Sequence, residues 1–550
     1  MNAARGHLLH LVGFVCVCAF PLRSAEDFTA VRSSRAVELP AFVVSDDSGW
    51  RYTRSSDLEV LSMTDDTATK RWFSEFQREV ALARLLFPEG FLPKPAVPSL
   101  AIVHGGRYPP RAQANWAGVI LTDRVDYDLA TFVINVEWFS RNRVQITEDV
   151  GYTLPSVTRY TLWLLDCRKP RPPSWLSSGI GALFDWKVFC ADAVLLPNMT
   201  ATRTLGDDEK RRLVERNIKL KENGGNPLLR SSDAFVAPHL DVGAMLETWT
   251  GFGSEIPSVS REVQESAKLF VLWGLLDRDY TGRFWEFVRR TSEEKLTEAL
   301  FKECFGFGYA EANDKVRAAY RTLLTSEKRL ALASVDTPLK QPVIEVRAPQ
   351  SLEIVRILGE WRRLTAQTIS DRAERNAAFD SALERLMRLR PELRLDPSYC
   401  ATLGICAMDA GDADRAFTSL LNATNGRVVR PKAYLQLARL EFGRAVAALQ
   451  DGAKLSPKQT RDLLALLNAA RAQPPELAGV YELMCDVWRR SAEPPTREDL
   501  AVLEHGTRMF VLDAKLIRSV AVLHANAGLS DEATTIARRW AKANGSPAAE

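Results

Sequence analysis

The sequence predicts an α+β domain built on a small mixed sheet, followed by an all-α region of helical repeats. Short apolar runs with strand character lie in the first quarter of the chain. From residue 351 onward alanine, leucine and arginine dominate, with helical periodicity. The length of 550 residues is also too great for one ordinary core, which favours more than one domain.

The N-terminal segment has the layout of a secretory signal peptide. Arg5 precedes an apolar run from Leu8 to Phe20, which is too short to span a bilayer comfortably. We therefore expect a signal peptide over residues 1–25 and export from a bacterial cell, to the periplasm or the outside. Cleavage after Ala25 and cleavage after Ala19 both stay open, and an uncleaved anchor or a buried N-terminal helix is the alternative.

A polar linker is expected over residues 26–48, and an α+β domain over residues 49–335. Leu58–Met63 predicts its first strand, and Asp65 supplies the N-cap of a helix. Apolar residues at helical spacing continue this helix up to a stop at Pro88. Those residues are Phe73, Phe76, Val80 and Ala83.

Three further apolar runs predict the rest of a small mixed sheet: Ser99–Val103, Val119–Leu121 and Ala130–Val136. From Leu154 onward the pattern becomes helical and is expected to stay so. Two groups of aromatic residues at helical spacing are expected to lie in the core of this domain. They are Trp72, Phe73 and Phe76, and Trp273, Phe284, Trp285 and Phe287.

A proline-rich stretch marks the expected boundary between the two regions. Pro338, Pro342 and Pro349 flank Val343–Arg347, which is expected to be extended. We therefore place a linker at residues 336–350 and tetratricopeptide-like helical repeats at residues 351–550.

The repeats are predicted from small and large residues at fixed places. Leu403 and Gly404 form a large-small pair and Gly411 marks a turn. Ala416, Leu420 and Ala423 then provide a small-large-small pattern, and Val520, Ala521, Gly528, Ala533 and Ala537 repeat these offsets at the end of the chain. Such small residues let two antiparallel helices approach closely. A generic alanine-rich bundle is the alternative.

The charge balance excludes some classes of partner. The 72 basic and 69 acidic residues give a net charge of only +3 and are intermixed, so nothing indicates nucleic-acid binding. After the N-terminal segment no run is long and apolar enough to cross a membrane. Protein or peptide partners, bound through the repeats, are the expectation that remains.

Two neighbouring segments resemble the core of gluzincin metallopeptidases of the peptidase-MA type. In that family a helix with the motif H-E-x-x-H is followed by a helix that begins P-x-W-L-x-E-G-x-A. Here Pro173, Trp175, Leu176 and Gly179 match the second motif, and residues 158–165 stand in the place of the first. The resemblance implies a zincin-like domain over residues 49–335.

The residues that would bind zinc in that family are replaced. Thr158 and Leu162 stand where the two histidines belong, Arg159 replaces the general-base glutamate, and Ser178 replaces the third ligand. Leucine does not ligate metals, and the charge of Arg159 would repel a cation. The six histidines of the chain, at positions 7, 10, 104, 239, 505 and 524, include no pair four residues apart. No H-E-x-x-H motif therefore exists in this sequence.

These observations predict an exported, non-catalytic pseudo-metallopeptidase that binds peptide or protein partners, with no metal and no cofactor. The alternative is an enzyme with non-zinc chemistry, because Arg159, Tyr160, Asp166 and Ser178 lie near the former site. A structural envelope component is a third hypothesis, in which Leu162 and Trp163 fill the former cleft.

Overall fold

The computed structural model describes residues 49–104, 128–135, 155–184, 188–189, 193–196, 240–248, 261–325, 330–334, 344–389, 395–450 and 452–544. The expected signal peptide, the linker at 26–48 and the strand expected at Val119–Leu121 lie outside these residues.

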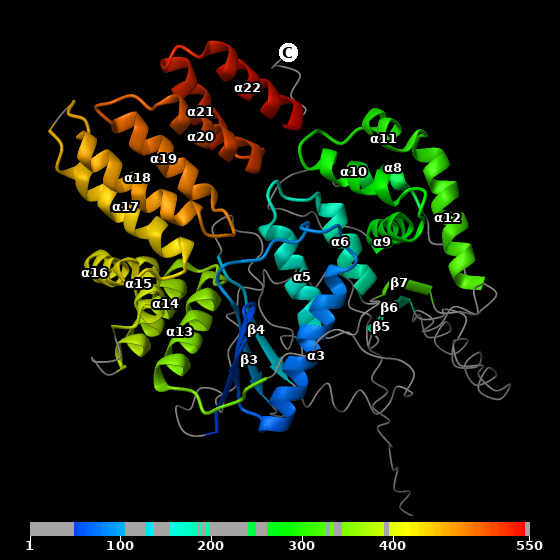
Figure 1. The fold of residues 1–550 in the computed structure, drawn as a ribbon, viewed down its shortest axis with the longest axis horizontal. Coiled ribbons are helices and arrows are strands. Elements are labelled where there is room, and N and C mark those ends of the chain that lie inside the picture. Colours follow the sequence, from blue (N-terminus) through cyan, green and yellow to red (C-terminus); the bar gives the residue numbers. More distant parts are fainter. Residues whose placement is uncertain are drawn as a thin grey trace, which may run out of the picture.

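The first part of the chain combines two small sheets with helices (Figure 1). Its strands are β1 (Arg51–Arg54), β2 (Leu58–Ser62), β3 (Ser99–His104), β4 (Thr131–Asn135), β5 (Val188–Phe189), β6 (Ala193–Leu196) and β7 (Leu330–Ser334). Its helices are α3 (Asp66–Arg84), α5 (Pro155–Cys167), α6 (Ser174–Phe184), α8 (Val242–Thr248), α9 (Arg261–Leu276), α10 (Thr281–Thr291), α11 (Glu298–Phe305) and α12 (Tyr309–Thr325).

The first sheet has the strand order β1-β2-β3-β4. The β1–β2 pair is antiparallel and the other two pairs are parallel, so the predicted mixed sheet is confirmed. Asp65 caps α3 as expected, since its Oδ1 accepts a hydrogen bond of 2.7 Å from the amide of Ala68. Strand β1 was not predicted, because its four residues Arg51–Arg54 have a charge at each end and contain no apolar run.

The second sheet corrects the expectation that the chain stays helical after Leu154. Strands β5, β6 and β7 form an antiparallel sheet in that order. They are only two to five residues long, and β7 comes from a distant part of the sequence. Strands this short carry little periodic signal, and their pairing depends on contacts that local patterns do not encode.

Alternate residues of the first sheet enter two separate cores. Val60, Val103 and Phe132 face α3, α5 and α6 and are buried with them. Leu61 and Ile102 face the opposite way. The expected aromatic core is confirmed, because Trp72, Phe73, Phe76, Trp273, Phe284 and Phe287 are buried and Trp285 packs against them.

Helices α6 and α9 approach so closely at Gly179 that a side chain there would collide. A Cβ atom at Gly179 would lie 2.5 Å from Cγ2 of Val271 and 2.6 Å from the backbone oxygen of Ala267. We expect Gly179→Ala to lower the free energy of unfolding by about 1–3 kcal/mol, measured by urea denaturation. Gly282 of α10 has nothing within 4 Å of its Cβ position. Gly282→Ala, the matched control, should instead stabilise the protein by up to about 1 kcal/mol. Equal effects of the two substitutions would contradict this packing.

The second part of the chain is an array of antiparallel helix pairs, which follow one another in an arc (Figure 1). The helices are α13 (Ser351–Gln367), α14 (Arg372–Met387), α15 (Pro397–Ala410), α16 (Ala413–Asn425), α17 (Pro431–Ala447), α18 (Pro457–Arg471), α19 (Ala478–Arg490), α20 (Arg497–Met509), α21 (Ala514–Asn526) and α22 (Ser530–Asn544).

The residues that predicted the first repeat and the glycine turn of the last one occupy the expected places, whereas Ala537 of the last repeat is exposed. Gly411 ends α15 with φ of +84° and Gly528 follows α21 with φ of +79°, a conformation that glycine adopts without strain. A Cβ atom at Gly404 would lie 2.6 Å from Cγ of Leu420, so the small residue is needed where α15 meets α16. Ala416 and Ala423 are fully buried in the same contact. The C-terminal part is therefore a tetratricopeptide-like helical array.

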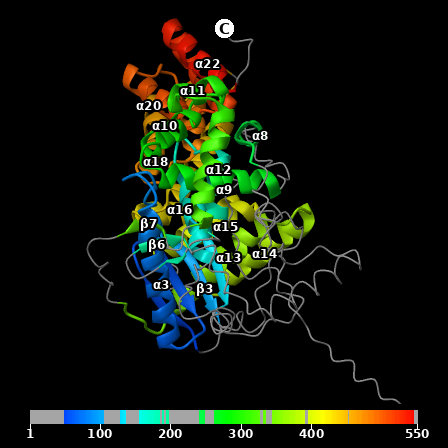
Figure 2. The same ribbon diagram turned by 90° about the vertical axis from the view of Figure 1, so that its right-hand side faces the viewer.

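The two parts share a core at their junction, on the inner side of the arc (Figures 1 and 2). Helix α13 covers the second face of the first sheet, where Trp361 is buried with Tyr52 and Leu61. Arg347 adds to the edge of this sheet, since its backbone exchanges hydrogen bonds of 2.8 and 3.0 Å with Tyr52. The end of the expected extended stretch Val343–Arg347 thus pairs with β1.

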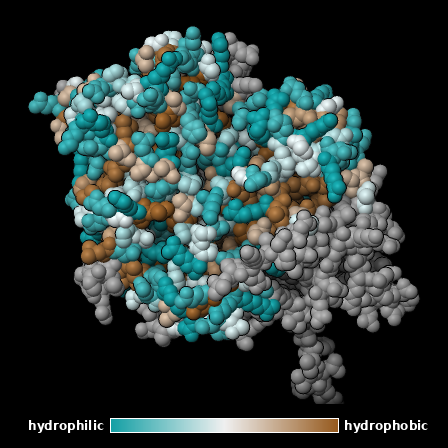
Figure 3. Space-filling model, viewed as in Figure 1, coloured by the Kyte–Doolittle hydropathy of each residue, from teal (hydrophilic) through white to brown (hydrophobic). Residues whose placement is uncertain are grey.

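The visible surface is predominantly hydrophilic. Figure 3 shows apolar residues as separate patches among hydrophilic ones. In the described part of the chain, Leu85, Leu395, Val429 and Val522 are the strongly exposed large hydrophobic residues. No helix within the described ranges combines the length and apolarity needed to cross a bilayer.

Candidate functional site

Helix α5 carries three of the four residues that the sequence resemblance singled out, Thr158, Arg159 and Leu162. Thr158 and Leu162 lie one turn apart and are both buried, with 6% and 9% of their surface exposed. Arg159, between them, is partly buried. The helix is fixed by the ring of Tyr160, whose centroid lies 5.6 Å from that of Phe76 in α3.

The fourth residue, Ser178, is partly buried on α6, a helix that packs against α5. This helix is held by Trp175, which is fully buried and contacts the rings of Phe270, Phe284 and Phe287 at 5.4 to 5.9 Å. The four positions therefore lie on two adjoining helices beside the first sheet.

The chemistry available at these positions is not that of a metal centre. A threonine, an arginine, a leucine and a serine occupy these positions, and hydroxyl groups are poor zinc ligands at neutral pH. Among the residues that the structure describes, no three His, Cys, Asp or Glu side chains come together in a way that could hold a metal ion.

The residues of the alternative, non-zinc site have separate structural surroundings. Burial raises the pKa of Tyr160, whose side chain is fully enclosed in the aromatic core. A phenol with a raised pKa is a poor general base at neutral pH. Asp166, at the other end of α5, forms an ion pair of 2.5 Å with Arg171. These contacts indicate structural roles for Tyr160 and Asp166.

A buried ionic network at the junction escaped the sequence analysis. Glu360 of α13 accepts hydrogen bonds from Arg363 at 2.5 Å and from Arg430 at 3.0 Å. Arg430 also binds Asp128 at 2.7 Å, and Arg363 binds Asp409 at 2.8 Å. Carboxylates and guanidinium groups thus alternate from Asp128, just before β4, to Asp409, near the end of α15.

The network keeps its central carboxylate ionised. Burial opposes ionisation of Glu360, but the neighbouring Arg363 and Arg430 outweigh it and lower the pKa of Glu360 to about 2. The same carboxylate raises the pKa of Arg363 against the effect of burial. Nothing in the sequence indicates this network, because its members are spread over 302 positions without a repeated spacing.

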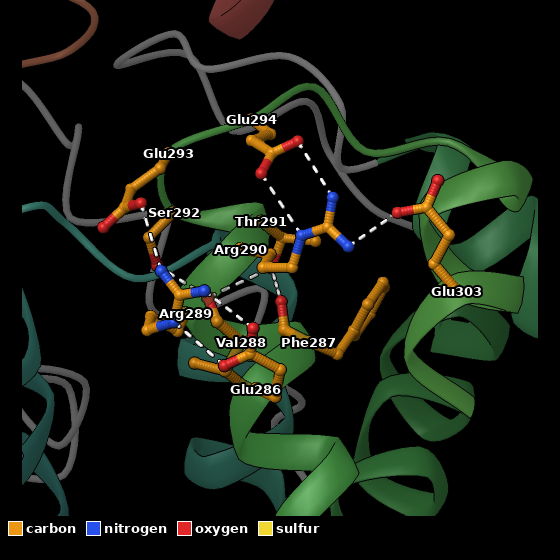
Figure 4. Close-up of polar contacts among 10 residues, drawn as sticks. All are labelled: Glu286, Phe287, Val288, Arg289, Arg290, Thr291, Ser292, Glu293, Glu294 and Glu303. Atoms are coloured by element: carbon orange, nitrogen blue, oxygen red, sulfur yellow. Dashed lines mark hydrogen bonds and ion pairs between the residues drawn. The ribbon is translucent and has the colours of Figure 1, made fainter.

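Unlike the buried network around Glu360, the ion pairs at the end of α10 are accessible to solvent (Figure 4). Arg289 binds Glu286 at 2.6 Å, and Arg290 binds Glu303 of α11 at 2.7 Å. Arg289 and Glu286 are each about half exposed, with side-chain exposures of 52% and 47%. Solvent screens such pairs, so this cluster is a solvated surface that ties α10 to α11.

His104, the last residue of β3, is completely buried, and this burial lowers its pKa from 6.5 to about 4. The unfolded chain therefore takes up a proton near pH 6.5 while the folded protein stays neutral at this position down to about pH 4. Stability present above pH 6.5 should be lost as the pH falls to 4, by roughly 3 kcal/mol.

Urea denaturation between pH 7 and 4 tests this expectation. His104→Gln should flatten the decline in the free energy of unfolding over this range. His505→Gln, which removes a histidine that is 48% exposed on α20, is the comparison variant. The same decline in His104→Gln as in the unchanged protein would assign the acid sensitivity to other groups.

The fold and its contacts define an α+β unit joined through a shared core to a tetratricopeptide-like helical array. No protein-family model matches the sequence, and no curated protein matches it.

Solved structures match about a third of the chain. The MamA protein has a TM-score of 0.27 and 16% identity, over 35% of this chain and 94% of that chain. The 41-end form of MamA from Desulfovibrio magneticus RS-1 has a TM-score of 0.25 and 17% identity, over 34% and 97%. A thermophilic TPR protein in Thermus thermophilus has a TM-score of 0.25 and 16% identity, over 36% and 93%. The assignment of the repeats rests on the helix packing described above.

Proposed function

We propose that the chain is an exported, non-catalytic protein that binds a peptide or protein partner, with a degenerate gluzincin-like domain as its scaffold. The observation that carries the proposal is which side chains occupy positions 158, 162 and 178 on the helix pair α5–α6. Residues 158 and 162 are one turn apart on a helix, residue 178 is on the adjoining helix, and none of the three side chains is a zinc ligand. The frame of a metallopeptidase site without its ligands is what a pseudopeptidase would retain.

The repeats supply the expected binding surface. Stacked helix pairs offer extended surfaces to protein partners. The first domain occupies much of the inner side of the arc, through contacts of Trp361, Arg430 and Pro474 with the sheet and its loops. A partner would therefore meet the outer surface of the array or its last helices.

Restoring the lost residues tests the proposed kinship. The fourfold variant Thr158→His, Arg159→Glu, Leu162→His and Ser178→Glu should bind one zinc ion, and the unchanged protein should contain none by elemental analysis. The matched control keeps Leu162 and restores the other three, so it lacks one ligand and should bind zinc at least about tenfold more weakly. A folded fourfold variant without zinc affinity would argue against a gluzincin-like helix pair, and stoichiometric zinc in the unchanged protein would argue against a degenerate site.

Export is tested separately. Mass spectrometry of protein recovered from a bacterial periplasm should give a mature N-terminus at Glu26 or at Phe20, according to the cleavage point. Retention of residues 1–19 in the recovered protein would contradict a cleaved signal peptide.

A further inference from the structure

A cavity of about 170 Å³ lies where the first domain meets the repeat array. The first domain contributes Phe91, Arg168 and Lys169 to its lining, and the array contributes Pro474, Glu476 and Met509. The walls are thus largely apolar, with two cationic groups and one carboxylate among them. Every residue named here belongs to the described part of the chain.

Lys169 and Arg168 both keep unused hydrogen-bond donors in this cavity, and Lys169 has the compact charge of an ammonium group. Its Nζ donates one hydrogen bond, of 2.6 Å, to the backbone carbonyl of Asp166 and lies 5.7 Å from the ring centroid of Phe510. An ammonium group has three donors, and within the described ranges Lys169 forms no ion pair. Burial lowers the pKa of Lys169, as expected for a cation without a counter-ion at hydrogen-bond distance.

The other charged groups of the cavity have partners. The guanidinium of Arg168 stacks on the ring of Phe91 at 4.1 Å and donates to its carbonyl at 2.9 Å. The carboxylate of Glu476 accepts a hydrogen bond from the hydroxyl of Tyr481 and lies 3.6 Å from Nε2 of His505. The lining therefore keeps one positive charge in excess, and Lys169 is where a negative ligand would find donors.

We propose that this junction cavity binds the carboxylate of a small monoanion, with Lys169 as the anchoring cation and Phe91 and Met509 against an apolar stem. One excess charge and few donors suit a carboxylate better than a phosphate dianion, which needs several donors. The volume equals roughly six water molecules and is below the 300–1,000 Å³ of sites for larger ligands, so a short-chain acid or the end of a peptide fits. The site does not depend on the proposed function.

A ligand bound in this cavity would stabilise the contact between the first domain and the repeat array. The cavity exists only while Lys169 of the first domain faces Glu476 and Met509 of the array, so a ligand binds the joined state in preference to the separated one. Such a ligand raises the unfolding temperature with concentration. Butyrate is the probe for this effect, and butyramide at the same ionic strength is its neutral isostere.

The expected result is a rise in unfolding temperature with butyrate and none with butyramide, together with butyrate binding by titration calorimetry. Lys169→Met should weaken butyrate binding by at least about tenfold. Lys70→Met, which removes an exposed lysine on α3, should leave it unchanged. If Lys169→Met does not fold, Met509→Trp fills the cavity while keeping Lys169 and should abolish binding.

A second pair of probes distinguishes a small acid from a peptide C-terminus as the ligand. These probes are acetyl-Ala-Ala-Val with a free and with an amidated C-terminus. Tighter binding of the free-acid peptide than of butyrate assigns the cavity to a peptide end, and the reverse assigns it to a small acid. Equal responses to butyrate and butyramide, unchanged affinity in Lys169→Met, or no response to any carboxylate at millimolar concentration would overturn the proposal.

Discussion

Replacing Glu360 by glutamine is expected to lower the free energy of unfolding by about 3–5 kcal/mol, because removing one member of a buried ion network leaves the others uncompensated. The side chains of Glu360 and Arg363 are each 1% exposed, and Glu360 is the group that Arg363 and Arg430 share. Urea denaturation at neutral pH measures the difference. A loss below about 1 kcal/mol would mean that the two arginines are satisfied without Glu360.

The matched control is Glu286→Gln, which breaks the exposed ion pair with Arg289 shown in Figure 4. Its cost should stay below about 1 kcal/mol. Because the folded pKa of Glu360 is lowered from 4.5 to about 2, its stabilising effect is present above pH 4.5 and is lost as the pH falls towards 2. The gap between the unchanged protein and Glu360→Gln should therefore close over this interval.

Trp175→Ala is expected to cost about 3–5 kcal/mol, since it removes a fully buried indole and leaves a cavity between three phenylalanine rings. Thermal or urea unfolding followed by far-ultraviolet circular dichroism measures this loss. Leu85→Ala, at a residue that is 43% exposed, should change stability by less than about 0.5 kcal/mol. Similar effects of both substitutions would show that α6 is not packed as described.

Features whose cause is local were predicted correctly from the sequence. Asp65 caps α3 because its carboxylate bonds an amide three residues away, and Gly411 ends α15 because only a short stretch of backbone decides its conformation. The small residues Gly404 and Ala416 mark a helix contact through their spacing alone. Each of these signals is contained within a few turns of chain.

Features that depend on distant contacts were missed. Asp128 meets Arg430 across 302 positions, and a lone charge beside a strand gives no hint that it is buried. Strand β6 pairs with β5 beside it, but its other partner, β7, comes more than 130 residues later, so the short apolar runs of β5 and β6 did not stand out against the helices around them. The covering of the sheet by α13 was missed for the same reason.

Positions 158, 159, 162 and 178 show how far a motif can be interpreted. Pro173, Trp175, Leu176 and Gly179, which carry the resemblance, are all buried, and Gly179 is required by contact with the backbone of Ala267. Such residues are selected by packing, so they indicate a helix pair and not a reaction. The proposed kinship with gluzincins depends on the chemistry at these four positions, which is why the restoration experiment targets them.

The first sheet and helix α13, which covers it, are far apart in the sequence, so the sheet is translated long before its cover. The first sheet emerges with one apolar face uncovered, and its cover, Ile357 and Trp361 of α13, is translated about 230 positions after β4 begins. At ~5–20 residues per second that face is open to solvent for roughly 10–45 s. The nascent chain therefore exposes an apolar sheet face during synthesis. Holding chaperones would bind this face until α13 covers it.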